Sequence, residues 1–162
     1  MWRVMGVLSL GGGFSGLVYL FMVLLQGVAI DLWVTITIVA ATALYGFGVW
    51  SGMRLLEGRP GAAQVNLLYW CIQIPMLNTP VVALQFYVGA TAVVSASLGW
   101  DASGTDEVNF GANALFGSSV EWSLMQGDVP WEVGVNLLAC VIVWKGRRLL
   151  RQEAAAAKDD IW

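Results

Sequence analysis

The sequence predicts an all-α integral membrane protein: a four-transmembrane-helix bundle forming one domain over residues 1–162. The first observation is composition, because 58% of the residues are hydrophobic and only 12% are charged. Soluble domains carry about 25% charged residues, so much of this surface must face lipid. The second observation is four apolar runs, and the third is the placement of every Lys and Arg on one side of them.

The first two runs cover residues 4–25 and 32–53. Each is long enough to cross a hydrocarbon core of about 30 Å as a helix. A cleavable signal peptide is the alternative for the first run, since it has a basic start and Gly27-Val28-Ala29 resembles a cleavage site. The apolar region of a signal peptide has only about 7–15 residues, which favours a retained transmembrane helix.

The third run covers residues 65–97 and the fourth covers residues 131–150, followed by a charged, alanine-rich tail over 151–162. A straight helix over the third run would be about 50 Å long, which exceeds the bilayer core. Pro75 and Pro80 interrupt it, because proline removes a backbone donor and clashes with the preceding turn. We therefore expect a proline-kinked third transmembrane helix.

The charges predict the orientation of the bundle. The basic residues lie at the N-terminus, in the segment after the second run, and in the tail: Arg3, Arg54, Arg59, Lys145, Arg147, Arg148, Arg151 and Lys158. The turn over 26–31 and the loop over 98–130 contain none of them. By the positive-inside rule both termini are cytoplasmic and the long loop is periplasmic. We expect a multi-pass protein of the bacterial inner membrane, embedded in the lipid bilayer, with no basic patch suited to nucleic acid.

Polar side chains in the third and fourth runs are the candidate ligand-binding residues: Gln73, Asn78, Gln85 and Asn136. Amides inside a membrane bundle commonly hold helices together by hydrogen bonds. The alternative is a polar cavity between the third and fourth helices that binds a small apolar or lipid-like ligand. Both interpretations stay open at this point.

Small residues four positions apart predict close helix packing: Gly12 and Gly16 in the first run, and Gly48 and Gly52 in the second. The first run also matches the dinucleotide-binding pattern G-x-G-x-x-G. That pattern requires a preceding strand and a following helix N-terminus, and neither fits inside a membrane span.

The long loop has the alternation of apolar and polar residues that is typical of strands. With Gly117-Ser118-Ser119 as a three-residue turn, Phe116 would pair with Val120 in a short β-hairpin. An isolated hairpin is marginally stable, so its apolar face needs cover. We expect Phe110, Phe116 and Trp122 to form a lid on the outer mouth of the bundle, with docking to another subunit as the alternative.

The sequence indicates no catalytic residue, cofactor or metal site. The chain has no histidine, and its two cysteines, Cys71 and Cys140, lie in apolar segments as expected of buried thiols. The leading hypothesis is therefore a scaffold, accessory or assembly subunit with a protein partner or a second copy. Binding or transport in the polar cavity is the second hypothesis. A lipid-modifying enzyme is the third, and it would need an acid–base pair such as Asp31 beside Glu132.

Overall fold

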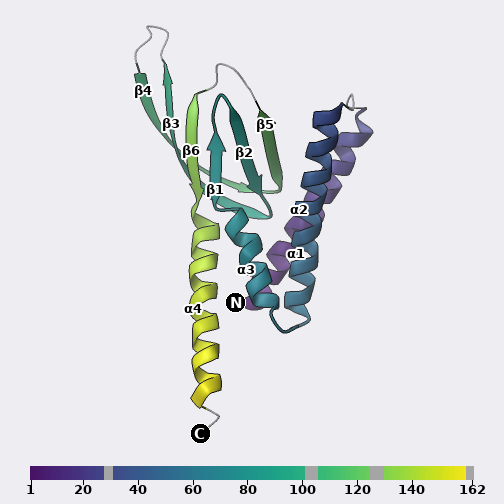
Figure 1. The fold of residues 1–162 in the computed structure, drawn as a ribbon, viewed down its shortest axis with the longest axis vertical. Helices are drawn as coiled ribbons and strands as arrows, with labels where there is room; N and C mark the ends of the chain where they lie inside the picture. Colours follow the sequence, from purple (N-terminus) through teal and green to yellow (C-terminus); the bar gives the residue numbers. More distant parts are fainter. Residues whose placement is uncertain (28–30, 101–105, 125–129, 160–162) are drawn as a thin grey trace.

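The computed structural model describes residues 1–27, 31–100, 106–124 and 130–159, which form four helices and a six-stranded sheet. The helices are α1 (Trp2–Leu25), α2 (Leu32–Leu56), α3 (Ala62–Ile72) and α4 (Leu137–Asp159). Figure 1 shows α1 and α2 side by side along one flank, with α3 and α4 below the sheet. The prediction of an all-α four-helix bundle is therefore wrong.

Helices α1 and α2 form an antiparallel hairpin and are long and apolar enough to cross a membrane. A signal sequence or the core helix of a soluble protein can share this length and composition. Of the 18 most apolar consecutive residues, only 28% in α1 and 17% in α2 are buried inside the molecule, whereas a soluble core helix is mostly buried. The Asp31 carboxylate caps α2 by accepting a hydrogen bond from the Val34 N–H at 2.7 Å.

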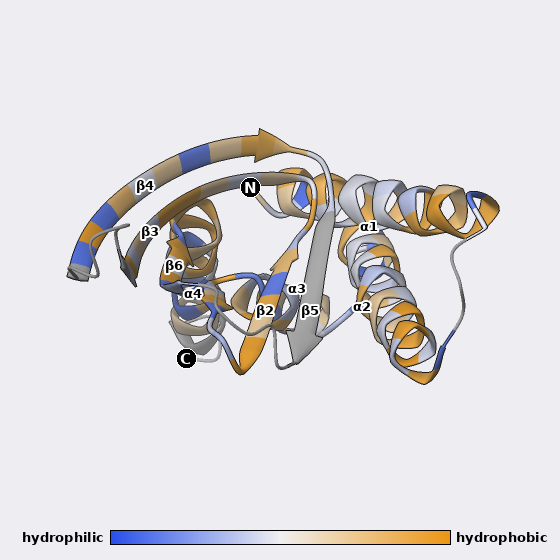
Figure 2. Cartoon of the chain, turned by 90° about the horizontal axis from the view of Figure 1, so that it is seen from above, coloured by the Kyte–Doolittle hydropathy of each residue, from blue (hydrophilic) through white to orange (hydrophobic). Residues whose placement is uncertain are grey.

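The sheet has the strand order β4-β3-β6-β1-β2-β5, and all neighbouring strands are antiparallel. Its strands are β1 (Pro75–Asn78), β2 (Val82–Tyr87), β3 (Ala90–Trp100), β4 (Asp106–Phe116), β5 (Ser119–Leu124) and β6 (Trp131–Asn136). Seen from above, the sheet curves away from α1 and α2 (Figure 2).

One long hairpin, bent at its middle, builds most of this sheet. Strand β2 pairs with β5 as far as Tyr87↔Ser119, and β3 pairs with β4 from Ala90↔Phe116 onward. Two residues on each side separate these pairs, so the register continues unchanged across the bend. The bend divides the hairpin into two arms, β2–β5 and β3–β4, and β6 and β1 fill the space between them.

The bend, which we call the corner (residues 88–89 and 117–118), packs on the middle of α1. The Ser118 hydroxyl donates to the carbonyl of Gly12 at 2.8 Å, and the Gly117 N–H donates to the carbonyl of Gly89 at 2.7 Å. Gly89 has φ +82°, a conformation that glycine adopts without strain. The corner thus fixes the sheet to the first helix.

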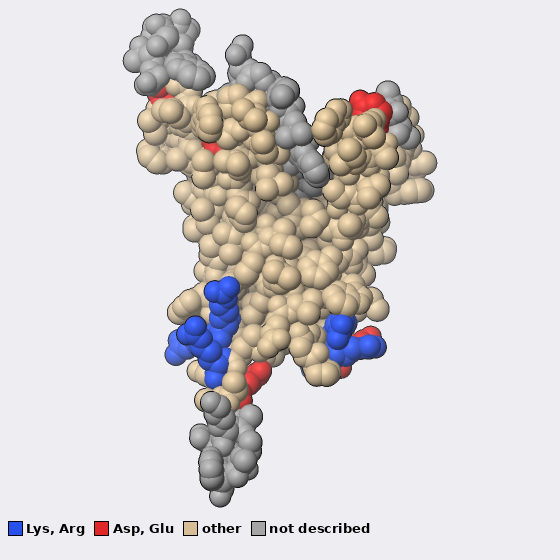
Figure 3. Space-filling view, in the orientation of Figure 1, with Lys and Arg blue, Asp and Glu red and all other residues tan. Residues whose placement is uncertain are grey.

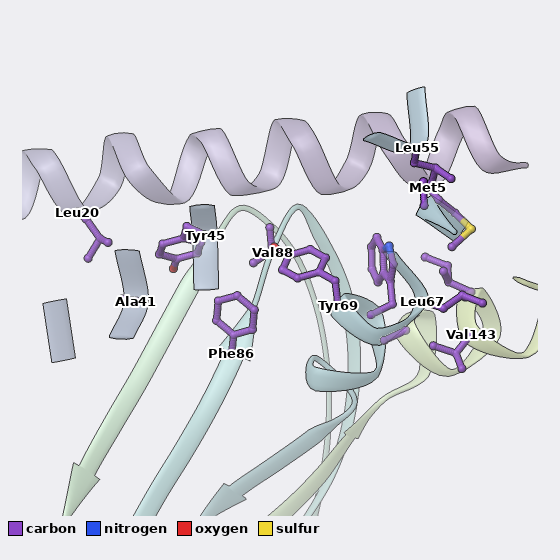
Figure 4. Packing of buried hydrophobic residues seen from close by; sticks show 14 residues of the cluster. Met5, Leu20, Ala41, Tyr45, Leu55, Leu67, Tyr69, Phe86, Val88 and Val143 are labelled. Atoms are coloured by element: carbon purple, nitrogen blue, oxygen red, sulfur yellow. The ribbon is translucent and has the colours of Figure 1, made fainter. Parts of the chain in front are cut away.

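Aromatic side chains from different elements form the core where the sheet meets the helices (Figure 4). Phe86 of β2 lies between Tyr45 of α2 and Tyr69 of α3, with ring centroids 5.5 Å and 6.1 Å away. Met5 of α1 and Val143 of α4 belong to the same buried cluster. Since α1 forms one wall of this core, its removal would expose the packed side chains.

The predicted third helix over 65–97 ends after eleven residues of α3, and the chain continues as β1, β2 and β3. Helix α3 ends at Ile72, before both prolines: Pro75 begins β1, and Pro80 lies between β1 and β2, so neither of them kinks a continuous helix. The residues beyond them include the β-branched Thr91, Val93 and Val94, which favour strands.

The predicted fourth helix over 131–150 is also wrong at its start, because residues 131–136 form β6 between β3 and β1. The helix α4 begins at Leu137. Asn136 marks this change, because its side-chain oxygen accepts from the N–H of Ala139 at 3.3 Å as a helix N-cap.

The predicted hairpin between residues 110 and 124 does not form, although both of its strands exist. Strands β4 and β5 lie at opposite edges of the sheet, and each pairs with a strand from the earlier part of the chain. Gly117 and Ser118 therefore belong to the corner and not to a tight turn.

Candidate binding site on the inner face of the sheet

The register gives the sheet one apolar and one polar face. Side chains opposite one another in a sheet share a face, so Val94, Ala112 and Val135 lie together on the apolar face. This outer face contributes many of the exposed apolar side chains: Leu84, Val94, Leu98, Val108, Phe110, Phe116, Trp131, Val133 and Val135. Much of the apolar face of the sheet is thus open.

Polar side chains occupy the opposite, inner face. Glu132 of β6 is paired with Asn78 of β1 on one side and Ser97 of β3 on the other. Ser97 is in turn paired with Asn109 of β4. A continuous polar row thus crosses four strands.

A cavity of about 330 Å³ lies on this inner face. Both arms of the bent hairpin and strands β1 and β6 line it: Met76, Gln85, Tyr87, Thr91, Val93, Ser95, Gly111, Ala112, Asn113, Leu115 and Glu132. The bend at the corner is what brings Gln85 and Tyr87 on one arm towards Thr91 and Ser95 on the other. This volume is at the lower end of the range for small-molecule sites, about 300–1,000 Å³.

The polar groups of this face include atoms with unused hydrogen-bonding capacity. The Tyr87 hydroxyl and the Asn78 side-chain oxygen are buried and have no partner among the described residues. Among the residues whose side chains the structure describes, Glu132 is the only one with a carboxyl group that lines the cavity. The described part of the site therefore combines hydroxyl and amide groups with the negative charge of Glu132.

Two of the four predicted ligand-binding residues lie at the cavity or beside one of its lining residues on this inner face. Gln85 lines the cavity, and Asn78 is the direct strand neighbour of Glu132. Most of the predicted third helix and the start of the predicted fourth helix are strands. The cavity therefore lies on a face of the sheet and not between two helices.

The other two predicted residues make structural hydrogen bonds. Gln73 is fully buried, and its side-chain oxygen accepts from the Val88 N–H at 3.0 Å, which ties the end of α3 to the corner. Asn136 is also fully buried, and its oxygen accepts from Ala92 of β3 at 3.3 Å as well as capping α4.

The four predicted packing glycines lie at close contacts of different kinds. A Cβ atom on Gly12 would lie 2.4 Å from Val88 at the corner, and one on Gly52 would lie 2.7 Å from the carbonyl of Gly6. Gly16 faces the ring of Tyr45, and Gly48 faces the hydroxyl of Tyr69. Only Gly52 of the four lies against the backbone of the other helix in the α1–α2 pair.

Two of the three predicted lid residues, Phe110 and Phe116, cover nothing in the described structure. Phe110 and Phe116 are 82% and 93% exposed on β4. Trp122 belongs to β5, and its side chain lies outside the described part of the chain.

Sequence reasoning missed Tyr87, Thr91, Ser95 and Glu132 as members of one site. A signal was present, because Thr91, Ser95 and Ser97 alternate with apolar residues over 91–98, as in a strand with one polar face. A buried polar cluster was also missed: the Asn66 amide donates to the hydroxyls of Ser9 at 2.9 Å and Ser51 at 3.2 Å.

The described residues contain no group of three or more His, Cys, Asp or Glu side chains that could bind a metal. Asp31, one member of the acid–base pair considered above, caps α2, while Glu132 lies on the inner face of the sheet. Cys71 and Cys140 are both free and half-buried. The described cavity wall thus offers the Glu132 carboxylate and the hydroxyl groups of Tyr87, Thr91 and Ser95 as polar groups that can contact a ligand.

Comparison with protein families, curated proteins and solved structures finds no significant match for this chain.

Proposed function

We propose that this chain is a membrane-anchored binding protein whose curved sheet binds a small polar ligand with a positively charged group. The observation that supports this best is the cavity of about 330 Å³ with polar walls in a protein of largely apolar surface. A cationic ligand fits because Glu132 supplies a negative charge in the cavity wall. Tyr87 and Gln85 would bind its polar groups by hydrogen bonds.

The membrane location is supported by the distribution of charge over the whole surface. In Figure 3 the Lys and Arg side chains gather at one end, together with some acidic side chains, whereas only acidic charges are seen at the other end, and a largely uncharged band lies between them. Helix α1 has 24 residues and is about 36 Å long, enough to cross this band. By the positive-inside rule the basic end is cytoplasmic, as expected for a multi-pass protein of the bacterial inner membrane.

In this orientation the sheet lies within and beyond the outer half of the bilayer. The corner contacts Gly12, near the middle of α1, and the strands run from there towards the acidic end. The apolar outer face would contact lipid, while the polar inner face would contact the ligand and water. Retention of α1 is supported by its place in the buried core.

The proposal is tested with the purified protein in mild detergent and a panel of small organic cations, including choline and spermidine, with thermal unfolding as the readout. We expect at least one cation to raise the unfolding temperature of the wild type and not of Glu132→Gln. Glu107→Gln is the matched control, because Glu107 is exposed on β4 and does not line the cavity. Equal responses of the two variants, or no response to any cation, would contradict the proposal.

A second candidate function is assembly, favoured by the exposed edge strand β4. Every described side chain from Glu107 to Gly117 is exposed, and the outer edge of this strand has no partner in the described structure. Long, apolar edge strands readily pair with another chain. Open sheet edges are not tolerated in lipid, so a membrane location adds to this need. We propose a second copy of the chain as the partner, because antiparallel pairing of β4 with itself joins apolar face to apolar face.

A further inference from the structure

Helix α4 carries a second surface feature, at the opposite end of the molecule from the polar cavity. A shallow groove of about 780 Å³ runs along it from the end of α3 towards the C-terminus. Its lining is Ile74, Cys140, Val143, Trp144, Arg147, Arg148, Arg151, Gln152 and Ala155. Among the described residues this lining contains three arginines and no acidic side chain.

The spacing of the lining residues explains the shape of the groove. Residues four apart on a helix lie above one another, so Val143, Arg147 and Arg151 form one row. Cys140, Trp144 and Arg148 form the neighbouring row. In both rows the apolar side chains come first and the arginines follow about one turn later. The groove is therefore apolar at its sheet end and strongly basic at its other end.

We propose that this groove binds one anionic phospholipid of the cytoplasmic leaflet. Its acyl chain would lie against Ile74, Val143 and Trp144, and its phosphate would be bound by Arg147 and Arg151. Guanidinium groups bind phosphate oxygens in pairs of parallel hydrogen bonds, which suits arginine better than lysine for this task. The exposed ring of Trp144 lies between the apolar and basic parts, at the level where tryptophan prefers the bilayer interface.

Two features of the groove favour a lipid over a free anion. A free phosphate would have no use for the apolar half, which continues the uncharged band of the surface in Figure 3. Both halves lie on one helix face about 22 Å long, which matches a headgroup followed by part of an acyl chain. The inference rests on the proposed membrane span and adds a lipid-binding site that is separate from the cavity in the sheet.

The test uses the full chain purified in mild non-ionic detergent, with phosphatidylglycerol or phosphatidylcholine added in the same micelles. Native mass spectrometry counts retained lipid, and thermal unfolding measures its effect. We expect phosphatidylglycerol to be retained one per chain and to raise the unfolding temperature, and phosphatidylcholine to do neither. The double variant R147Q/R151Q should bind phosphatidylglycerol about 10- to 30-fold more weakly, since each surface arginine contributes about 1 kcal/mol to anionic-lipid binding.

The control variant K145Q/R3Q also removes two positive charges from this end of the molecule, but at positions outside the groove. It should bind phosphatidylglycerol like the wild type. Equal weakening in both variants, an equal effect of inorganic phosphate alone, or retention of both lipids alike would overturn the inference. A chain that stays soluble without detergent would contradict the membrane span itself, whereas a detergent-dependent chain indifferent to phosphatidylglycerol would contradict only the groove.

Discussion

At the residue scale, the contact between Gly12 and the corner shows how one missing side chain sets the position of the sheet. A Cβ on Gly12 would lie 2.4 Å from Val88 and 2.6 Å from the Gly89 nitrogen. The second of these neighbours is backbone and cannot turn away. A Cβ on the adjacent Gly11 would have no such neighbouring atom within 4 Å.

We therefore predict that Gly12→Ala lowers the free energy of unfolding by about 1–3 kcal/mol, the usual cost of overpacking. For a chain of this size each kcal/mol corresponds to about 2–4 °C in the unfolding temperature. Gly11→Ala is the control and should have no destabilising effect, because its Cβ enters open space. Thermal unfolding in detergent compares the two, and equal temperatures would show that the corner does not pack on α1 as described.

The candidate site could be predicted from the sequence only in part, for a reason that lies in individual residues. Asn78 and Gln85 were identified by their polarity in an apolar run, and both lie on the inner face of the sheet. Gln73 and Asn136 have the same polarity, yet their oxygens accept backbone hydrogen bonds. Polarity alone cannot separate these roles, because the difference lies in which backbone N–H, from the corner or from a distant strand, reaches the amide oxygen.

At the element scale, the sequence predicts α1 and α2 well and the later elements poorly. Residues 82–98 are apolar on one face and only weakly polar on the other, so their period-2 signal is masked by overall hydrophobicity. Short apolar runs of this kind cannot be told from buried helix by periodicity alone. Strand β6 depends on β1 and β3, more than 30 residues earlier in the chain, and no local pattern shows that pairing.

The edge strand β4 carries the prediction that belongs to this scale. Phe110→Lys should convert a dimeric wild type into a monomer, because an edge lysine opposes strand pairing with a second copy. Native mass spectrometry of the protein in detergent or nanodiscs measures the oligomeric state.

Leu84→Lys provides the matched control for this variant. Leu84 and Phe110 lie on the same outer face, but β2 has β1 on one side and β5 on the other, so position 84 is away from the β4 edge. The control should remain dimeric. A wild type that is monomeric at all concentrations would exclude the β4 pairing.

At the scale of the whole molecule, the separation of charge predicts which parts of the chain face each side of the membrane. Single cysteines at positions 31, 58 and 107, in a background with Cys71 and Cys140 replaced by serine, report this with a membrane-impermeant maleimide. Positions 31 and 107 should react in intact spheroplasts, because they lie at the acidic end. Position 58, beside Arg59 at the basic end, should react only after permeabilisation. Reaction at all three positions in intact spheroplasts would contradict a membrane span.

The position of β6 between β1 and β3 has a consequence for the order in which the chain folds during synthesis. Until residues 131–136 have left the ribosome, β1 and β3 each lack the neighbour that completes their hydrogen bonds. Unpaired backbone groups are costly in hydrocarbon, so in the proposed membrane location strands β1 and β3 would need β6 before they could pack stably beside α1. Helices α1 and α2 have no such requirement, since their backbone bonds are internal. In the proposed membrane location, biogenesis is therefore divided into two stages: early insertion of a helical hairpin, followed by assembly of the sheet once β6 has been synthesised.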